Sequence, residues 1–116
     1  MALSTSWYGQ RISVPGTTVV NSGATATLVA APGAGTTLRL GALWISAEAA
    51  GGFKGIIRES GGNEIFTVKA ANMSSFALTL PATGYRLSGT ALGLQLVNNS
   101  GVGGTVGVGG LYRWDV

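Results

Sequence analysis

The sequence predicts an all-β fold, namely a single-domain β-sandwich of about eight short antiparallel strands. Three observations lead to this prediction. Apolar residues alternate at period two in many short segments, and clusters of Gly, Asn, Ser and Pro separate these segments. No stretch of the chain shows a convincing helical period. The length of 116 residues is that of one domain.

The N-terminal segment, residues 1–10, is interpreted as an arm that precedes a sandwich domain of residues 11–116. It is rich in Ser and Thr and contains two aromatic residues near its end, Trp7 and Tyr8. Terminal segments are ordered only where something holds them down, so we expect these two rings to dock on a surface. That surface belongs either to a partner or to the core of the chain itself.

The first predicted strands are separated by turn signals. The turn pair Pro15-Gly16 divides the first strand from the second, and a Pro-Gly-Ala-Gly turn ends the third. These three predicted strands are residues 11–14, 17–20 and 24–31.

The strongest strand pattern covers residues 36–46. Its predicted buried face carries Leu38, Leu40, Ala42 and Trp44. The opposite face is polar at Arg39 but apolar at Leu43 and Ile45. A strand that is apolar on both faces is covered on both, either by its own domain or by a neighbour.

The clearest hairpin is predicted from residues 53–59 and 64–70, joined by a Ser-Gly-Gly-Asn turn. Glu59 and Glu64 flank this turn. We interpret them as solvated hairpin ends that pair with cations across the two strands, namely Lys54, Arg58 and Lys69. The alternative is a pair of carboxylates in a cleft, as in a glycosidase.

The second half of the chain continues the same pattern. In the last strand, four residues share one phase and are predicted to lie in the core or in an interface: Val106, Val108, Tyr112 and Trp114. The four strands predicted after the hairpin are residues 76–80, 85–87, 92–97 and 105–115.

The composition offers little to a catalytic site, because the chain has no His, no Cys and only four acidic residues. An ordinary Ser-His-Asp triad and a zinc site are excluded, and one Asp is too few for a calcium site. The Gly-rich segments 32–37 and 101–107 lack the spacing of phosphate-binding loops. We therefore expect no enzymatic activity, no metal and no cofactor.

Charge and hydropathy restrict the partners. The seven cations are spread along the chain, whereas nucleic-acid binders cluster theirs, so we expect no nucleic acid as partner. No apolar stretch reaches the roughly 20 residues of a membrane span, and residues 1–7 do not resemble a secretory signal. We therefore expect no membrane partner and folding in the cytoplasm.

The low charge predicts self-association. Charged residues make up 9% of the chain, against about 25% in typical soluble domains. A domain this small cannot easily cover so much apolar surface alone, so we expect a homo-oligomer, most simply a trimer. The residues predicted to lie in its interfaces are Trp7, Tyr8, Arg11, Leu43 and Ile45.

Three segments carry a family resemblance: LRLGALWIS at 38–46, LSGTALGLQL at 87–96 and VGVGGLY at 106–112. They resemble the capsid decoration (cement) proteins of tailed bacteriophages and the related jelly-roll modules of phage fibres. The resemblance covers residues 36–112. It implies a jelly-roll-like sandwich that forms homotrimers on the outside of a capsid, with the major capsid protein as partner.

We therefore expect a non-enzymatic virion structural protein that folds in the host cytoplasm and then decorates and stabilises a capsid shell. The alternative is a receptor- or carbohydrate-binding module of a phage fibre or tail tip. That alternative requires a stacking platform of exposed aromatic rings, for which the candidates are Trp7, Tyr8, Trp44, Tyr112 and Trp114.

Overall fold

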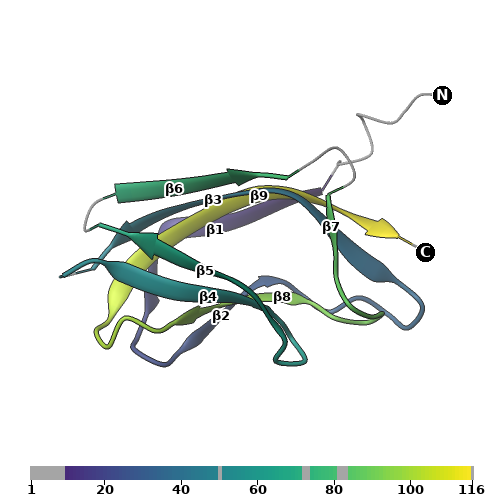
Figure 1. Ribbon diagram of the computed structural model, residues 1–116, viewed down its shortest axis with the longest axis horizontal. Coiled ribbons are helices and arrows are strands. Elements are labelled where there is room, and N and C mark those ends of the chain that lie inside the picture. Colours follow the sequence, from purple (N-terminus) through teal and green to yellow (C-terminus); the bar gives the residue numbers. More distant parts are fainter. Residues whose placement is uncertain (1–9, 50, 72–73, 81–83, 116) are drawn as a thin grey trace.

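The computed structural model describes residues 10–49, 51–71, 74–80 and 84–115. These residues form nine strands and no helix, arranged as two antiparallel sheets that face one another (Figure 1). The predicted all-β sandwich is therefore confirmed. The strands are β1 (Gln10–Val20), β2 (Thr25–Val29), β3 (Thr37–Glu48), β4 (Phe53–Glu59), β5 (Glu64–Ala70), β6 (Ser74–Thr79), β7 (Tyr85–Arg86), β8 (Leu94–Asn98) and β9 (Gly104–Asp115).

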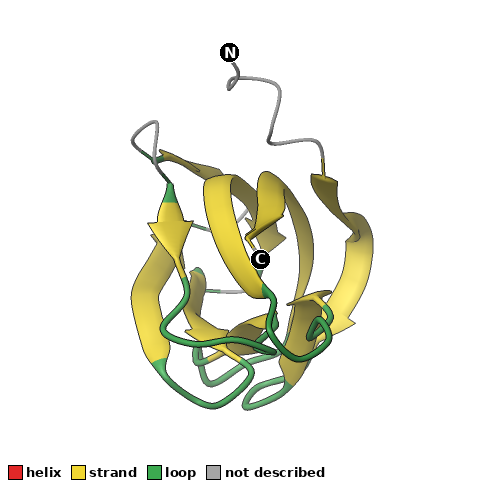
Figure 2. Cartoon of the chain, turned by 90° about the vertical axis from the view of Figure 1, so that its right-hand side faces the viewer, coloured by secondary structure: helices red, strands yellow, loops and turns green. Residues whose placement is uncertain are grey.

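The strand order is that of a jelly roll. One sheet has the order β1-β9-β3-β6 with β7 also paired to β3, and the other has the order β2-β8-β4-β5. Each strand of the first half of the chain pairs with its counterpart in the second half: β1 with β9, β2 with β8, β3 with β6 and β7, and β4 with β5. The chain is thus a long antiparallel ribbon wound into a sandwich. Figure 2 looks along the long axis and shows the sheets curving towards each other.

Strands β6 and β7 together occupy one edge of β3. Residues Ala42 to Ala47 of β3 pair with β6, and Arg39 and Leu40 pair with β7. The two short strands therefore take the place of one strand of an eight-stranded jelly roll. Both short strands are predicted from the sequence, as residues 76–80 and 85–87, whereas the predicted segments 11–14 and 17–20 form the single strand β1.

A β-bulge in β3 changes the predicted faces of this strand. The register against β9 shifts between Leu40 and Ala42, which adds one residue to β3. A one-residue shift moves all following side chains to the opposite face. Leu38 and Leu40 are buried as predicted, but after the bulge Leu43 and Ile45 are buried instead of Trp44.

Two predictions for β3 are therefore wrong. Leu43 and Ile45, predicted to lie in an interface, are part of the chain's own core and leave no side-chain surface for a partner. Trp44, predicted to be core, lies on the outer face with 46% of its surface exposed.

A second irregularity lies in β1. The Pro15-Gly16 pair was predicted to end a strand, but β1 continues through it, with a register shift against β9 between Val14 and Thr18. Pro cannot donate a backbone hydrogen bond, so within sheets it is confined to edges and bulges. Both conditions hold here, because β1 is the edge of its sheet.

The core lies between the two sheets and takes most of the large aliphatic side chains. From β9, Val106 and Val108 are buried, and Tyr112 and Trp114 pack against the core with their rings edge to face, 5.1 Å apart and inclined at 76°. These four residues share one face, as predicted. Among the described residues, the exposed large apolar side chains are Val19, Trp44 and Val102.

Asn98 ties one end of the sandwich together. Its side chain is fully buried, and its Nδ2 donates to the carbonyl oxygens of Val20 at 2.6 Å and Val102 at 2.8 Å. Its Oδ1 accepts from the backbone N–H of Ser100 at 2.9 Å and also from the Ser100 hydroxyl. One amide thus satisfies both the end of β1 and the loop between β8 and β9.

We predict that Asn98→Ala lowers the free energy of unfolding by about 3 kcal/mol, because the buried carbonyl group of Val20 loses its donor and the loop after β8 loses the hydrogen bonds of the amide to Ser100 and Val102. This corresponds to a melting temperature lower by roughly 10 °C, measurable by circular dichroism. Asn99→Ala is the matched control, since Asn99 is the exposed neighbour. Equal melting of the two variants would contradict the role assigned to Asn98.

Candidate functional site

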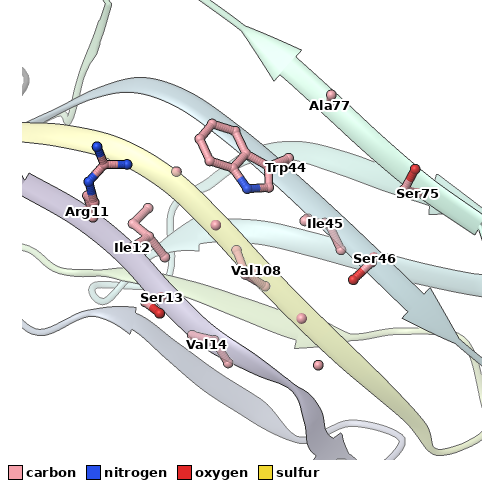
Figure 3. Close-up of a pocket in the computed structure, with 14 residues that line it drawn as sticks. Arg11, Ile12, Ser13, Val14, Trp44, Ile45, Ser46, Ser75, Ala77 and Val108 are labelled. Atoms are coloured by element: carbon pink, nitrogen blue, oxygen red, sulfur yellow. The ribbon is translucent and has the colours of Figure 1, made fainter.

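The outer face of the five-stranded sheet carries a broad groove around Trp44. The pairing register places Ser13, Gly109, Trp44 and Ala77 in one row across β1, β9, β3 and β6. The next row contains Gly107, Ser46 and Ser75. The groove has a volume of about 570 Å³, and Arg11 of β1 also lines it (Figure 3). We call it the Trp44 groove.

Small residues in β9 leave room for the indole of Trp44. A Cβ atom on Gly109 would come within 2.1 Å of Trp44 Nε1, so the ring lies directly on the glycine backbone. A Cβ atom on Gly107 would approach Ser46 Oγ to 3.1 Å and Gly16 Cα to 2.9 Å. The glycines at these two alternate positions therefore form the floor of the groove.

Three arginines surround one carboxylate on the same face of the sheet. Asp115 of β9 is 2.8 Å from Arg39 Nε, 3.0 Å from Arg113 Nε and 3.7 Å from Arg86 Nε. The strand register explains the gathering, because Arg39 lies directly opposite Arg113 on one side and Arg86 on the other. We call these four residues the arginine cluster. Like charges directly opposite one another are unfavourable, and the Asp115 carboxylate offsets this repulsion.

The groove and the arginine cluster belong to one continuous surface. Arg39 and Trp44 both lie on the outer side of β3, and Arg113 and Gly109 both lie on the outer side of β9. Arg11 lies opposite Leu111, between the row of Trp44 and the cluster. Four of the seven cations of the chain therefore gather on one face, although they are far apart in the sequence.

The two hairpin acids do not form a catalytic pair. Glu64 is exposed at the start of β5, but Glu59 is only 1% exposed, so its interpretation as a solvated hairpin end is wrong. Its carboxylate oxygens accept hydrogen bonds from the backbone N–H and the hydroxyl of Ser88, each at 2.6 Å. A buried carboxylate requires such partners, and here it anchors the connection between β7 and β8. Glu59 therefore has a structural role in this fold.

Of the predicted cation partners of these acids, Arg58 lies directly opposite Glu64 in the register of β4 and β5. Arg58 Nε donates to Gln95 Oε1 at 3.0 Å, across to the neighbouring strand β8. Lys54 and Lys69 lie directly opposite each other on β4 and β5 and line a second concavity of about 570 Å³ with Asn99 and Ser100. This lysine concavity lies on the other sheet, away from the Trp44 groove.

The described residues contain no group of three His, Cys, Asp or Glu side chains that could hold a metal ion. Within the same residues, no helix has the length and apolar character that a membrane span requires. The residues that line the Trp44 groove offer an aromatic ring, hydroxyl groups and a guanidinium group for binding.

Of the five predicted interface residues, the structure describes Arg11, Leu43 and Ile45. Trp7 and Tyr8 lie outside the described residues, whereas Arg11 is exposed at the Trp44 groove. Sequence reasoning missed Trp44 as a surface residue because it assumed unbroken alternation in β3. Gly41 in the middle of this strand was the available signal, since a glycine inside a strand often marks a bulge.

Comparison with known proteins gives no match: no family model, no curated protein and no solved structure matches this chain.

We predict that Asp115→Asn destabilises the fold by about 1–2 kcal/mol at low ionic strength, because the arginines of the cluster lose their shared counter-charge. Added salt should recover part of this loss, since ions screen the repulsion that remains. Thermal unfolding at about 0.02 M and 0.5 M salt measures both effects. Glu48→Gln, an exposed acid at the far end of β3, is the control, and a loss of the same size there would contradict the prediction.

Proposed function

We propose that this chain is a non-enzymatic virion structural protein that decorates and stabilises a capsid shell as an oligomer, with a trimer as the expected state. The observation that carries the proposal is the jelly-roll strand order, a topology found in viral capsid and lectin domains. A fold alone does not define a function, so the surface must supply the rest. The partner in this proposal is the major capsid protein.

The character of the outer face supports attachment to a large rigid partner. Around Trp44 the outward side chains are small, as at Ser13, Ser46, Ser75 and Ala77. Small side chains lose little rotamer entropy when they are covered, so this part of the face docks at low entropic cost. In an oligomer, several weak contacts made together raise the total affinity through effective concentration.

The basis for self-association differs from the one inferred from sequence. Burial of Leu43 and Ile45 in the core removes the apolar pair that suggested an interface. Val19 and Val102, two of the exposed large apolar residues in the part of the chain that the structure describes, lie at the end of the sandwich that Asn98 ties together. We place the contact between copies at this end, because it leaves the outer face of the five-stranded sheet accessible.

A second candidate function is a receptor- or carbohydrate-binding module of a fibre or tail tip. The half-exposed indole of Trp44 favours it, because an aromatic ring presented on a sheet is what a stacking platform requires. Tyr112 and Trp114, the other predicted platform residues on described strands, pack against the core and do not contribute.

We predict that the isolated protein is a trimer. Size exclusion with light scattering should give a mass three times 11.6 kDa at micromolar concentration. Replacing both exposed valines, Val19→Ser with Val102→Ser, should shift the population towards the monomer, whereas Val19→Ile should not. A mass of 11.6 kDa for the unmodified chain would rule out the oligomer.

We also predict that the protein raises the thermal stability of the shell. Particles that lack this protein should release their contents at a lower temperature, and adding the purified protein should restore the midpoint, because a ligand of the assembled state stabilises it by mass action. Particles that melt alike with and without the protein, but lose host attachment without it, would support the fibre or tail-tip function instead.

A further inference from the structure

We propose that the Trp44 groove binds an acidic saccharide, with a pyranose ring stacked on the Trp44 indole and a sugar carboxylate held by Arg11. This inference does not depend on attachment to a shell. It follows from three properties of the groove: how the ring is presented, which polar groups surround it and which charge dominates the face.

The exposure of Trp44 is built into the sheet. The ring rests on Gly109, where any side chain would collide with it, and its neighbours in the same row are only Ser13 and Ala77. No larger side chain of that row covers the ring, and 46% of the residue remains accessible. In Figure 3 the indole lies over β9 with its broad side open to view. A flat aromatic surface supported from below is suited to a flat ligand with apolar C–H groups.

The polar groups around the ring fit hydroxyl-rich ligands. Ser46 and Ser75 lie in the adjacent row, Ser13 lies beyond Gly109, and all three are exposed. Each hydroxyl both donates and accepts hydrogen bonds, as the hydroxyls of a sugar do. The groove of about 570 Å³ is within the usual size range of small-molecule sites, roughly 300–1,000 Å³.

The charge of the face selects an acidic ligand. Arg11 is exposed at the groove, and a guanidinium group matches the two oxygens of a carboxylate. The described residues of this face include four arginines but only two acids, Glu48 and Asp115. The same imbalance opposes a second copy of the chain as occupant, because two such faces would bring cations against cations.

The lysine concavity on the other sheet is the alternative binding place for an acidic ligand. Lys54 and Lys69 offer charge there, but an aromatic platform is missing among the residues that line it, since Phe53 is buried. An acid recognised by charge alone would bind at either place. A saccharide that also needs stacking would bind only at Trp44, and this difference makes the proposal testable.

The test is calorimetric titration of the isolated protein with trigalacturonate, and with neutral maltotriose as the matched probe. Trigalacturonate should bind at least about tenfold more tightly than maltotriose, a difference of roughly one charged contact. Trp44→Ala should abolish measurable binding of both probes. Arg11→Gln should weaken trigalacturonate at least about tenfold and remove the preference over maltotriose.

Three further variants separate the proposal from its rivals. Gly109→Ala displaces the ring without removing it and should weaken both probes, so it tests the platform even if Trp44→Ala fails to fold. Val19→Ala and Lys69→Gln are the controls for apolar surface and for charge, and both should bind as the unmodified protein does. Circular dichroism checks that each variant is folded.

Several outcomes would overturn the proposal. It fails if the unmodified protein binds no trigalacturonate, or if folded Trp44→Ala retains the affinity. It also fails if Lys69→Gln, rather than Arg11→Gln, abolishes binding, because the site is then the lysine concavity. If a tetraglutamate peptide binds as tightly as trigalacturonate, the groove recognises charge alone and is not a saccharide site. None of these results depends on whether the protein attaches to particles.

Discussion

The pairing of β3 on both of its edges is the constraint on which the rest of this structure depends. β3 hydrogen-bonds to β9 along one edge and to β6 and β7 along the other, so its register determines which residues of four strands lie side by side. The bulge between Leu40 and Ala42 adds one residue to β3 and none to β9. Before the bulge β3 contributes Leu38 and Leu40 to the core, and after the bulge it contributes Leu43 and Ile45. The core and the Trp44 groove are consequences of the same shift. The extra residue of the bulge turns Leu43 towards the core and Trp44 towards the outer face.

The sequence predicted the strands better than the faces. The hairpin of β4 and β5 was predicted with its observed bounds, since two short apolar segments are joined by a Gly-rich turn. The face of β3 was predicted wrongly after Gly41, because the prediction assumed unbroken alternation, which places every side chain after an extra residue on the wrong face. Pro15 was interpreted as the end of a strand for a related reason: a bulge in an edge strand and a turn use the same residues.

Most residues of the candidate site could not be predicted from the sequence. Arg11 was predicted as an interface residue and does lie at the groove, but the other members of the surface are brought together only by long-range pairing. Arg39, Arg86 and Arg113 are widely separated along the chain, and their register on three neighbouring strands creates a charged cluster that composition does not show. Likewise, the sequence predicts a solvated Glu59. Its burial depends on hydrogen bonds from Ser88, which lies far from it in the sequence, in the connection between β7 and β8.

The course of the chain through the five-stranded sheet also determines what lies at each end of this sheet. Gln10 pairs with Tyr112, so the polypeptide enters β1 beside the place where it leaves β9, and both points lie at the arginine-rich end of the face. Gln10 and Asp115 therefore both lie at this end of the sheet, and the loops around Asn98 lie at the opposite end. The sheet therefore has a polarity: its first and last strands meet beside the arginine cluster at one pole, and the buried amide of Asn98 holds the connecting loops at the other.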